Sequence, residues 1–176
     1  MHSGGHPTVA LVGNPNVGKS VIFNALTGAR AAVSNYPGTT VSLSRGTARL
    51  GKPSIDLVNT PGMYSLLPIS EEEQVAREVL FDSRPRLVVN VVDARNLDRM
   101  LGSTLQLIES GLSIVVALNM MAEAEASGIH IDYSLLAAKL GVPVIPLVAV
   151  TGKGIQDLKE AIGERLRKDP GLADVS

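Results

Sequence analysis

The stretch Gly13-Asn14-Pro15-Asn16-Val17-Gly18-Lys19-Ser20 decides the fold class of this chain. It follows an apolar run at 8–12 that is predicted to be a strand, and it precedes a helix-compatible run at 19–27. A glycine-rich loop in that position, ending in Gly-Lys-Ser, is typical of the P-loop, whose backbone amides surround an oligophosphate. Lys19 would place its charge against the β- and γ-phosphates, and Ser20 would offer an oxygen to Mg²⁺. The stretch therefore predicts a P-loop domain.

Apolar, β-branched runs alternate with helix-compatible runs along the rest of the chain. The predicted strands are residues 8–12, 55–59, 87–93, 113–119 and 144–148. The predicted helices are residues 19–27, 71–81, 97–109, 133–140 and 155–167. Continuous apolar strands separated by helices favour a mostly parallel sheet flanked by helices on both faces. The expected fold class is α/β, a P-loop NTPase with a small-GTPase-like G domain.

Composition limits the classes of partner. The 176 residues are enough for one domain, with 16 Lys and Arg against 17 Asp and Glu and a net charge of -1. Overall charge therefore gives no indication of nucleic-acid binding. The chain has no cysteine, which excludes disulfides and favours a reducing, cytosolic setting. We expect a flexible N-terminus at 1–7, a G domain at 8–168 and a tail at 169–176.

Two loops are candidates for nucleotide-dependent movement. The loop at 30–41 contains Thr40, whose hydroxyl would complete Mg²⁺ coordination when a γ-phosphate is present. The loop at 62–70 follows Asn59-Thr60-Pro61-Gly62, where GTPases carry Asp-x-x-Gly and the glycine amide senses the γ-phosphate. Asn59 would then hold Mg²⁺ through a water molecule.

The end of the strand at 113–119 carries a candidate base-reading motif. Asn119-Met120-Met121-Ala122 is similar to the Asn-Lys-x-Asp motif of GTPases, and Val148-Ala149-Val150 matches the short loop that flanks the base. These motifs predict a nucleotide-contacting set that consists of Gly13, Asn14, Pro15, Asn16, Val17, Gly18, Lys19, Ser20, Gly38, Thr39, Thr40, Val41, Ser42, Asn59, Thr60, Pro61, Gly62, Asn119, Met120, Met121, Ala122, Val148, Ala149 and Val150.

Taken together, the motifs resemble the cytosolic G domain of FeoB-type ferrous iron transporters. The most specific stretches are residues 13–16, 61–66, 90–94 and 143–148. The resemblance implies GTP and GDP as ligands, with Mg²⁺, and a regulatory role at the cytoplasmic face of the bacterial inner membrane. In that family the G domain precedes a helical regulatory domain and a membrane domain that carries Fe²⁺. The chain is thus expected to be a soluble fragment, able to form oligomers, whose tail begins a missing downstream region.

The catalytic set that we expect is small. Lys19, Thr40 and Gly62 would stabilise the charge that develops during hydrolysis. The resemblance implies that Asn16 also helps to hold K⁺ near the phosphates, although an asparagine beside Pro15 also suits a simple turn. Met63 stands where many GTPases have a water-orienting glutamine, so slow turnover is expected.

Two departures from the GTPase pattern leave alternatives open. Ala122 replaces the aspartate that accepts hydrogen bonds from guanine, which favours a relaxed-specificity NTPase unless Glu123 substitutes for it. Asn59 replaces an acid and, with Met63, favours a nucleotide-sensing switch that scarcely hydrolyses. An Era-like ribosome-assembly GTPase is disfavoured because the chain is short and near neutral. Asp93 is expected to cap a helix rather than bind Mg²⁺.

Overall fold

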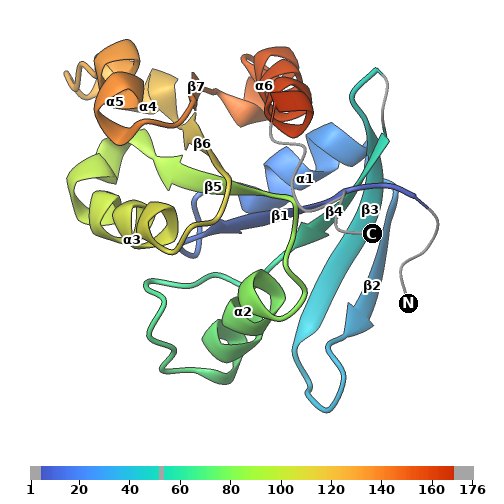
Figure 1. The fold of residues 1–176 in the computed structure, drawn as a ribbon. Helices are drawn as coiled ribbons and strands as arrows, with labels where there is room; N and C mark the ends of the chain where they lie inside the picture. Colours follow the sequence, from blue (N-terminus) through green and yellow to red (C-terminus); the bar gives the residue numbers. More distant parts are fainter. Residues whose placement is uncertain (1–4, 52–53, 169–176) are drawn as a thin grey trace.

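A computed structural model describes residues 5–51 and 54–168 (Figure 1). Within these residues, seven strands form one sheet in the order β2-β3-β4-β1-β5-β6-β7. The strands are β1 (Thr8–Gly13), β2 (Ala31–Asn35), β3 (Ser42–Arg49), β4 (Ser54–Asn59), β5 (Leu87–Asp93), β6 (Ile114–Asn119) and β7 (Val144–Pro146). The five strands from β4 to β7 in this order are parallel, whereas β2 and β3 are antiparallel to their neighbours. The mostly parallel sheet is confirmed.

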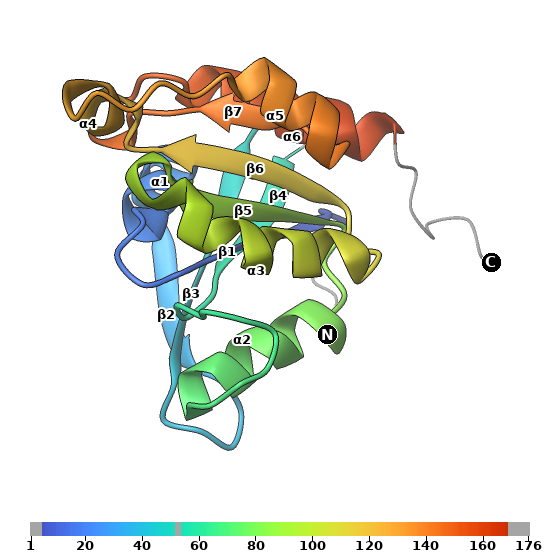
Figure 2. The same cartoon turned by 90° about the vertical axis from the view of Figure 1, so that its left-hand side faces the viewer.

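Helices cover both faces of this sheet (Figures 1 and 2). The α-helices are α1 (Lys19–Thr27), α2 (Glu71–Phe81), α3 (Leu97–Glu109), α4 (Met121–Ala126), α5 (Tyr133–Leu140) and α6 (Ile155–Lys168), with short 3₁₀ helices η1 (Ala94–Asn96) and η2 (Ala149–Thr151). Side chains alternate along β1, so Val9 and Leu11 pack with Ile22 and Leu158 under α1 and α6. Ala10 and Val12 pack on the opposite face, with α2 and α3.

The five predicted strands and five predicted helices are present, with ends that move by one or two residues. The sequence did not predict β2, β3 or α4. The sequence of β2 has no alternation of apolar and polar residues, because every residue of this strand is exposed and none needs an apolar side chain. Its strand structure comes from pairing with β3. The prediction that 30–41 is a loop is therefore wrong for 31–35. Within that range, Arg30 and the turn at 36–41 remain loop.

The chain ends fall partly outside the described residues. The carbonyl of Pro7 accepts a hydrogen bond from the Asp56 amide at 2.9 Å, so backbone hydrogen bonding to β4 begins one residue before β1. The predicted tail at 169–176 and residues 1–4 of the predicted flexible segment lie outside what the structure describes. Across 5–51 and 54–168, no helix has the length and apolar character that crossing a membrane requires.

Candidate functional site

The loop from Gly13 to Ser20 connects β1 to α1 and has the backbone form that a phosphate cradle needs. Asn16 has φ 65° and Gly18 has φ 98°, both in the left-handed region. A Cβ on Gly13 would lie 2.5 Å from the carbonyl oxygen of Val91, and one on Gly18 would collide with the side-chain amide of Asn119. The two glycines are required by close packing against neighbouring strands. The loop is thus fixed in place by the sheet.

Lys19 begins α1 and is buried at 9% exposure. Burial lowers the pKa of its ammonium group from 10.5. Its Nζ has no ion pair with any acid among the described residues. A buried charge without a partner is unfavourable, and an anion beside it would remove much of that cost. The electrostatics of Lys19 therefore favour a bound oligophosphate.

The proposed Mg²⁺ ligands are only partly brought together. Ser20 lies in the first turn of α1, and Asn59 ends β4, which is paired with β1 beside the cradle. The Oδ1 atom of Asn59 is buried and has no hydrogen-bond partner within the described residues. Such an atom needs a donor or a cation, so Asn59 fits the predicted role of accepting from a metal-bound water.

Thr40 is not placed at the cradle. It lies exposed in the turn between β2 and β3, and the two views show this turn beyond α2, away from α1 (Figures 1 and 2). The turn is closed by a hydrogen bond of 2.8 Å from the Tyr36 amide to the Val41 carbonyl, and Val41 itself is buried. Gly38, Thr39 and Ser42 belong to the same hairpin, so none of the predicted residues from 38 to 42 reaches the phosphate loop in this conformation.

Residues 59–63 are attached to the cradle by backbone contacts. A Cβ on Gly62 would lie 2.7 Å from Cγ of Pro15, and the Met63 amide donates to the Gly13 carbonyl at 3.0 Å. Thr60 is buried, and its hydroxyl donates to the Leu11 carbonyl at 2.7 Å, so this predicted contact residue serves the fold. Met63 is buried in the core below α2 and α3. The position of the water-orienting glutamine is therefore occupied by a core residue.

Asn119 joins the cradle to both predicted base loops. Its Nδ2 donates to the Val17 carbonyl at 3.0 Å, and its Oδ1 accepts from the Ala149 amide at 3.0 Å. Val148 and Ala149 are buried, whereas Val150 is 73% exposed. The prediction that Asn119 braces the cradle matches this geometry.

The turn after Asn119 differs from a motif that ends in an acid. Met120 has φ 63°, and the Met121 amide donates to the Leu147 carbonyl at 3.2 Å. Ala122 is exposed in the first turn of α4 and offers no hydrogen-bond acceptor in its side chain. Glu123 is exposed one residue later in the same turn. Nothing in the described contacts brings its carboxylate to the position that Ala122 leaves without an acceptor.

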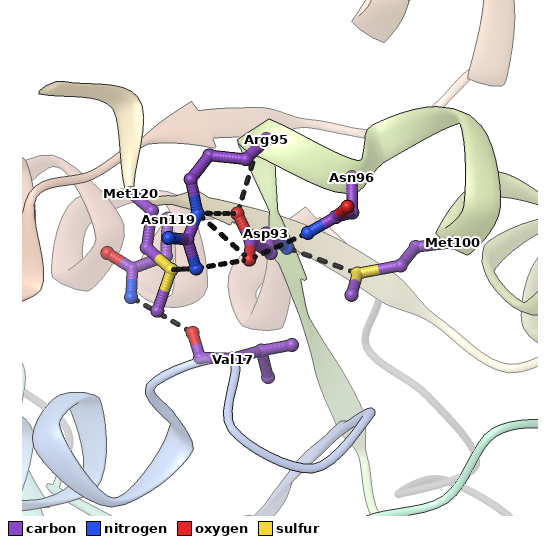
Figure 3. A network of polar contacts seen from close by, with 7 residues as sticks. All are labelled: Val17, Asp93, Arg95, Asn96, Met100, Asn119 and Met120. Atoms are coloured by element: carbon purple, nitrogen blue, oxygen red, sulfur yellow. Dashed lines mark hydrogen bonds and ion pairs between the residues drawn. The ribbon is translucent and has the colours of Figure 1, made fainter. Parts of the chain in front are cut away.

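A polar network that the sequence reading did not predict supports this turn (Figure 3). Asp93 ends β5, accepts from the Arg95 amide at 2.8 Å and forms a 2.9 Å ion pair with Nη2 of Arg95. The same Nη2 donates to Sδ of Met120 at 3.1 Å. Burial would raise the pKa of Asp93, but the hydrogen bonds and charge of Arg95 outweigh it and lower that pKa. The expectation that Asp93 caps a helix is confirmed, since it caps η1.

The spacing Asp93-x-Arg95 at the end of a buried strand was the only sequence signal for that network. Arg95 is distant from Met120 in sequence, and only the adjacency of β5 and β6 brings them together. Asn96 also donates to Asp93, at 3.3 Å.

The fold and the phosphate loop define a P-loop domain of the GTPase type. A family model described as "Ferrous iron transport protein B" matches residues 7–162, and the chain belongs to this family. It is 48% identical over 155 residues to a Porphyromonas gingivalis Fe(2+) transport protein A/FeoB fusion protein, covering 88% of this chain and 18% of that one. With the Escherichia coli K12 Fe(2+) transporter FeoB it shares 46% over 159 residues, 88% of this chain and 21% of the relative. The chain thus spans about a fifth of these relatives.

Solved structures give the same result. The cytosolic domain of Legionella pneumophila FeoB matches with a TM-score of 0.86 and 43% identity, covering 90% of this chain and 68% of that one. The FeoB G-domain of Methanococcus jannaschii matches with a TM-score of 0.78 and 41% identity, covering 92% and 98%. A similar structure of the Thermotoga maritima FeoB cytosolic domain is a GMPPNP form, with a TM-score of 0.84, 38% identity and coverage of 90% and 63%.

Proposed function

We propose that this chain binds GTP and GDP with Mg²⁺ and hydrolyses GTP slowly, as the regulatory domain of a membrane transporter for Fe²⁺. The observation that carries the proposal is Lys19, a buried ammonium group without an acidic partner among the described residues, at the end of a preformed phosphate loop. The nucleotide-bound relatives, an S. thermophilus NFeoB mutant bound to GDP and the T. maritima FeoB cytosolic domain in its GMPPNP form, support the choice of ligand.

Hydrolysis requires compensation for negative charge on the β–γ bridge and γ-phosphate oxygens while water attacks in line. The cradle amides and the Lys19 ammonium supply fixed positive charge and dipoles toward these oxygens. The Gly62 amide is held near the cradle by Pro15 and would donate to the γ-phosphate. Bound Mg²⁺ would add a divalent charge through Ser20, with a water held by Asn59. Because Met63 is buried, no side chain at that position would orient the water, so we expect slow turnover.

The Thr40 contact requires a change in the hairpin. In the described conformation the pairing of β2 with β3 keeps the turn at 36–41 away from the cradle. Binding of a γ-phosphate and Mg²⁺ would have to exceed the free energy of these backbone hydrogen bonds before Thr40 could reach the metal. We therefore assign the nucleotide-dependent change to β2 with its turn and to residues 62–70.

A role for Asn16 in holding K⁺ is part of the same proposal. The left-handed backbone at Asn16 explains why asparagine suits the turn beside Pro15. Its side chain is exposed and free to accept a cation at the edge of the cradle. Stimulation of phosphate release by K⁺ over Na⁺, lost in Asn16→Ala, would support this role, whereas equal rates in the two salts would remove it.

The second candidate function is an NTPase that accepts ATP as well as GTP. The observation that favours it is the exposed methyl group of Ala122, where guanine would need a carboxylate. Two lost charge-assisted hydrogen bonds of about 1.5 to 3 kcal/mol each correspond to two or more decades of discrimination. Both candidate functions are compatible with the same partners: a downstream helical regulatory region, a membrane region and other copies of the chain.

Calorimetry with GTP-γS and ATP-γS in Mg²⁺ separates the two candidates. A preference for GTP-γS of about a hundredfold would support the guanine-specific function, and near-equal affinities would support the relaxed one. If the affinities are near-equal, Ala122→Asp should create a preference for GTP-γS. Ala126→Asp adds the same charge on the same helix and serves as the control. Failure of both nucleotides to bind would overturn the proposed function itself.

Phosphate release distinguishes an enzyme from a sensor. A slow rate that depends on Mg²⁺ and disappears in Lys19→Ala would support hydrolysis. Tight binding without release in Mg²⁺ and K⁺ would instead assign the chain to the nucleotide-sensing class.

A further inference from the structure

A second hollow lies at the opposite end of α1 from the phosphate loop. It has a volume of about 660 Å³ and is bounded by the end of α1, by β2 and β3, and by Lys159 of α6. Its nearest lining residue on α1 is Ala25, so the hollow lies about 9 Å along the helix axis from the start of α1 at the cradle. None of its lining residues belongs to the nucleotide-contacting set that the sequence predicts.

Every charged residue that lines this hollow is a cation. They are Arg30, Arg45, Arg49 and Lys159. Arg45 also lines a neighbouring hollow that contains Asp56 and Asp82, whereas the other three cations line only this one of the two hollows. Within the described part of the chain, Arg30, Arg49 and Lys159 form no ion pair. A concentration of unpaired cations is notable in a chain whose net charge is -1.

The three cations come from three separate elements of the fold. Arg30 precedes β2 and follows two residues with left-handed backbone, Gly28 at φ 67° and Ala29 at φ 61°. An alanine in this region is unfavourable, so the turn that delivers Arg30 is held by its surroundings. Arg49 ends β3, and Lys159 is half-buried on α6. Their convergence is a property of the tertiary structure.

The edge of the sheet is open at this place. The pairing of β2 with β3 begins at Ala31 and Gly46, so β3 continues to Arg49 without a β2 partner. Glycine at position 46 allows the segment before β2 to lie close to β3, because a Cβ on Gly46 would lie 2.6 Å from the Arg30 carbonyl oxygen. The hollow is therefore formed by unpaired strand edge together with guanidinium and ammonium groups.

We propose that this hollow binds a phosphate-bearing anion larger than inorganic phosphate. Guanidinium groups match the geometry of phosphate oxygens, and an ammonium group adds a point charge. The volume lies in the range of small-molecule sites and exceeds what a single inorganic phosphate fills. A soluble diphosphate and the phosphate of a lipid headgroup both present this chemistry, and the relatives of this chain are named as transporters.

The first arm of the test uses pyrophosphate and the ¹⁵N-labelled chain. Because pyrophosphate also suits the cradle, amide shifts must be mapped separately for the two places. Shifts at Gly28, Arg30 and Gly46 would support the site, with an affinity that falls as salt is raised. Arg30→Gln combined with Lys159→Gln should weaken binding at the hollow by about tenfold, whereas Lys139→Gln, an exposed cation on α5, should not.

The second arm uses vesicles of phosphatidylglycerol and phosphatidylcholine, with pure phosphatidylcholine as the control. Co-sedimentation that requires phosphatidylglycerol and is lost in the double variant assigns the site to lipid headgroups. Pyrophosphate shifts without vesicle binding assign it to soluble anions. Shifts confined to the cradle with no vesicle binding, or binding that the double variant leaves unchanged, would overturn the proposal.

Discussion

At the scale of residues, two polar groups of the candidate site are buried without a partner among the described residues. Lys19 is buried and unpaired within the described residues, and Asn59 has an orphaned Oδ1 atom. Each carries a local cost that a bound nucleotide with its metal would offset. Stability and binding should therefore respond in opposite directions to changes at these positions.

Lys19→Ala should weaken binding of GDP with Mg²⁺ by about a hundredfold, since it removes a buried charge-assisted contact. The free energy of unfolding in the absence of nucleotide should stay unchanged or rise, because the variant no longer buries an unpaired cation. Calorimetry and urea denaturation measure the two effects, with Lys139→Ala as the exposed control. A variant that loses stability and binding together would show that Lys19 is chiefly structural.

Asp93 gives a pH dependence with a definite sign. Its folded pKa lies below 3.8, so its contacts with Arg95 stabilise the fold fully above about pH 4 and are lost as pH falls through the lower folded value. Asp93→Asn should cost about 1 kcal/mol at pH 7, a figure reduced because Arg95 is 44% exposed. The difference from the parent chain should shrink in denaturation series run from pH 7 down to pH 3. A difference that is constant with pH would exclude the ion pair as its cause.

At the scale of elements, the clearest contrast is between glycines that the packing requires and glycines that it does not. Gly102 lies inside α3, and a Cβ there would meet no atom within 4 Å. Gly46 lies in β3, where a Cβ would meet the Arg30 carbonyl and Thr27. The same substitution should have opposite signs at these two positions.

Gly102→Ala should stabilise the chain by about 0.5 to 1 kcal/mol through helix propensity and reduced freedom of the unfolded chain. Gly46→Ala should destabilise it by about 1 to 3 kcal/mol, because backbone must move to admit the methyl group. Urea denaturation of both variants measures the pair. Similar effects at the two sites would mean that Arg30 and β2 pack less closely against β3 than the structure shows.

The hairpin of β2 and β3 is the element on which nucleotide-dependent movement depends. Its exposed strand is retained by backbone hydrogen bonds rather than by an apolar face. GTP-γS with Mg²⁺ should therefore increase hydrogen exchange at the β2 amides, while GDP should leave them protected. Exchange followed by mass spectrometry measures this, and α3 provides an internal reference. Equal protection in both nucleotide states would contradict a role for Thr40 at the metal.

For the whole molecule, ligand binding and folding are coupled. If the proposed function holds, GDP with Mg²⁺ at a hundred times its dissociation constant should add about 2.7 kcal/mol to the free energy of unfolding. Thermal or urea denaturation with and without GDP measures the effect, and removal of Mg²⁺ by a chelator should reduce it. The Lys19→Ala chain should show almost no response. A full response in that variant would place the nucleotide outside the cradle.

The sequence alone determined the P-loop fold and its parallel strands, while the roles of the predicted site residues stay predictions. Apolar runs and a glycine-rich loop before Lys19 are local patterns. Such patterns can be recognised in the sequence without knowing which distant residues they will contact. Tertiary structure decided the rest. The exposed strand β2 depends on pairing with β3, Arg95 reaches Met120 only through adjacent strands, and the cations around the second hollow come from three elements. These features depend on long-range contacts, which spacing along a single sequence does not record.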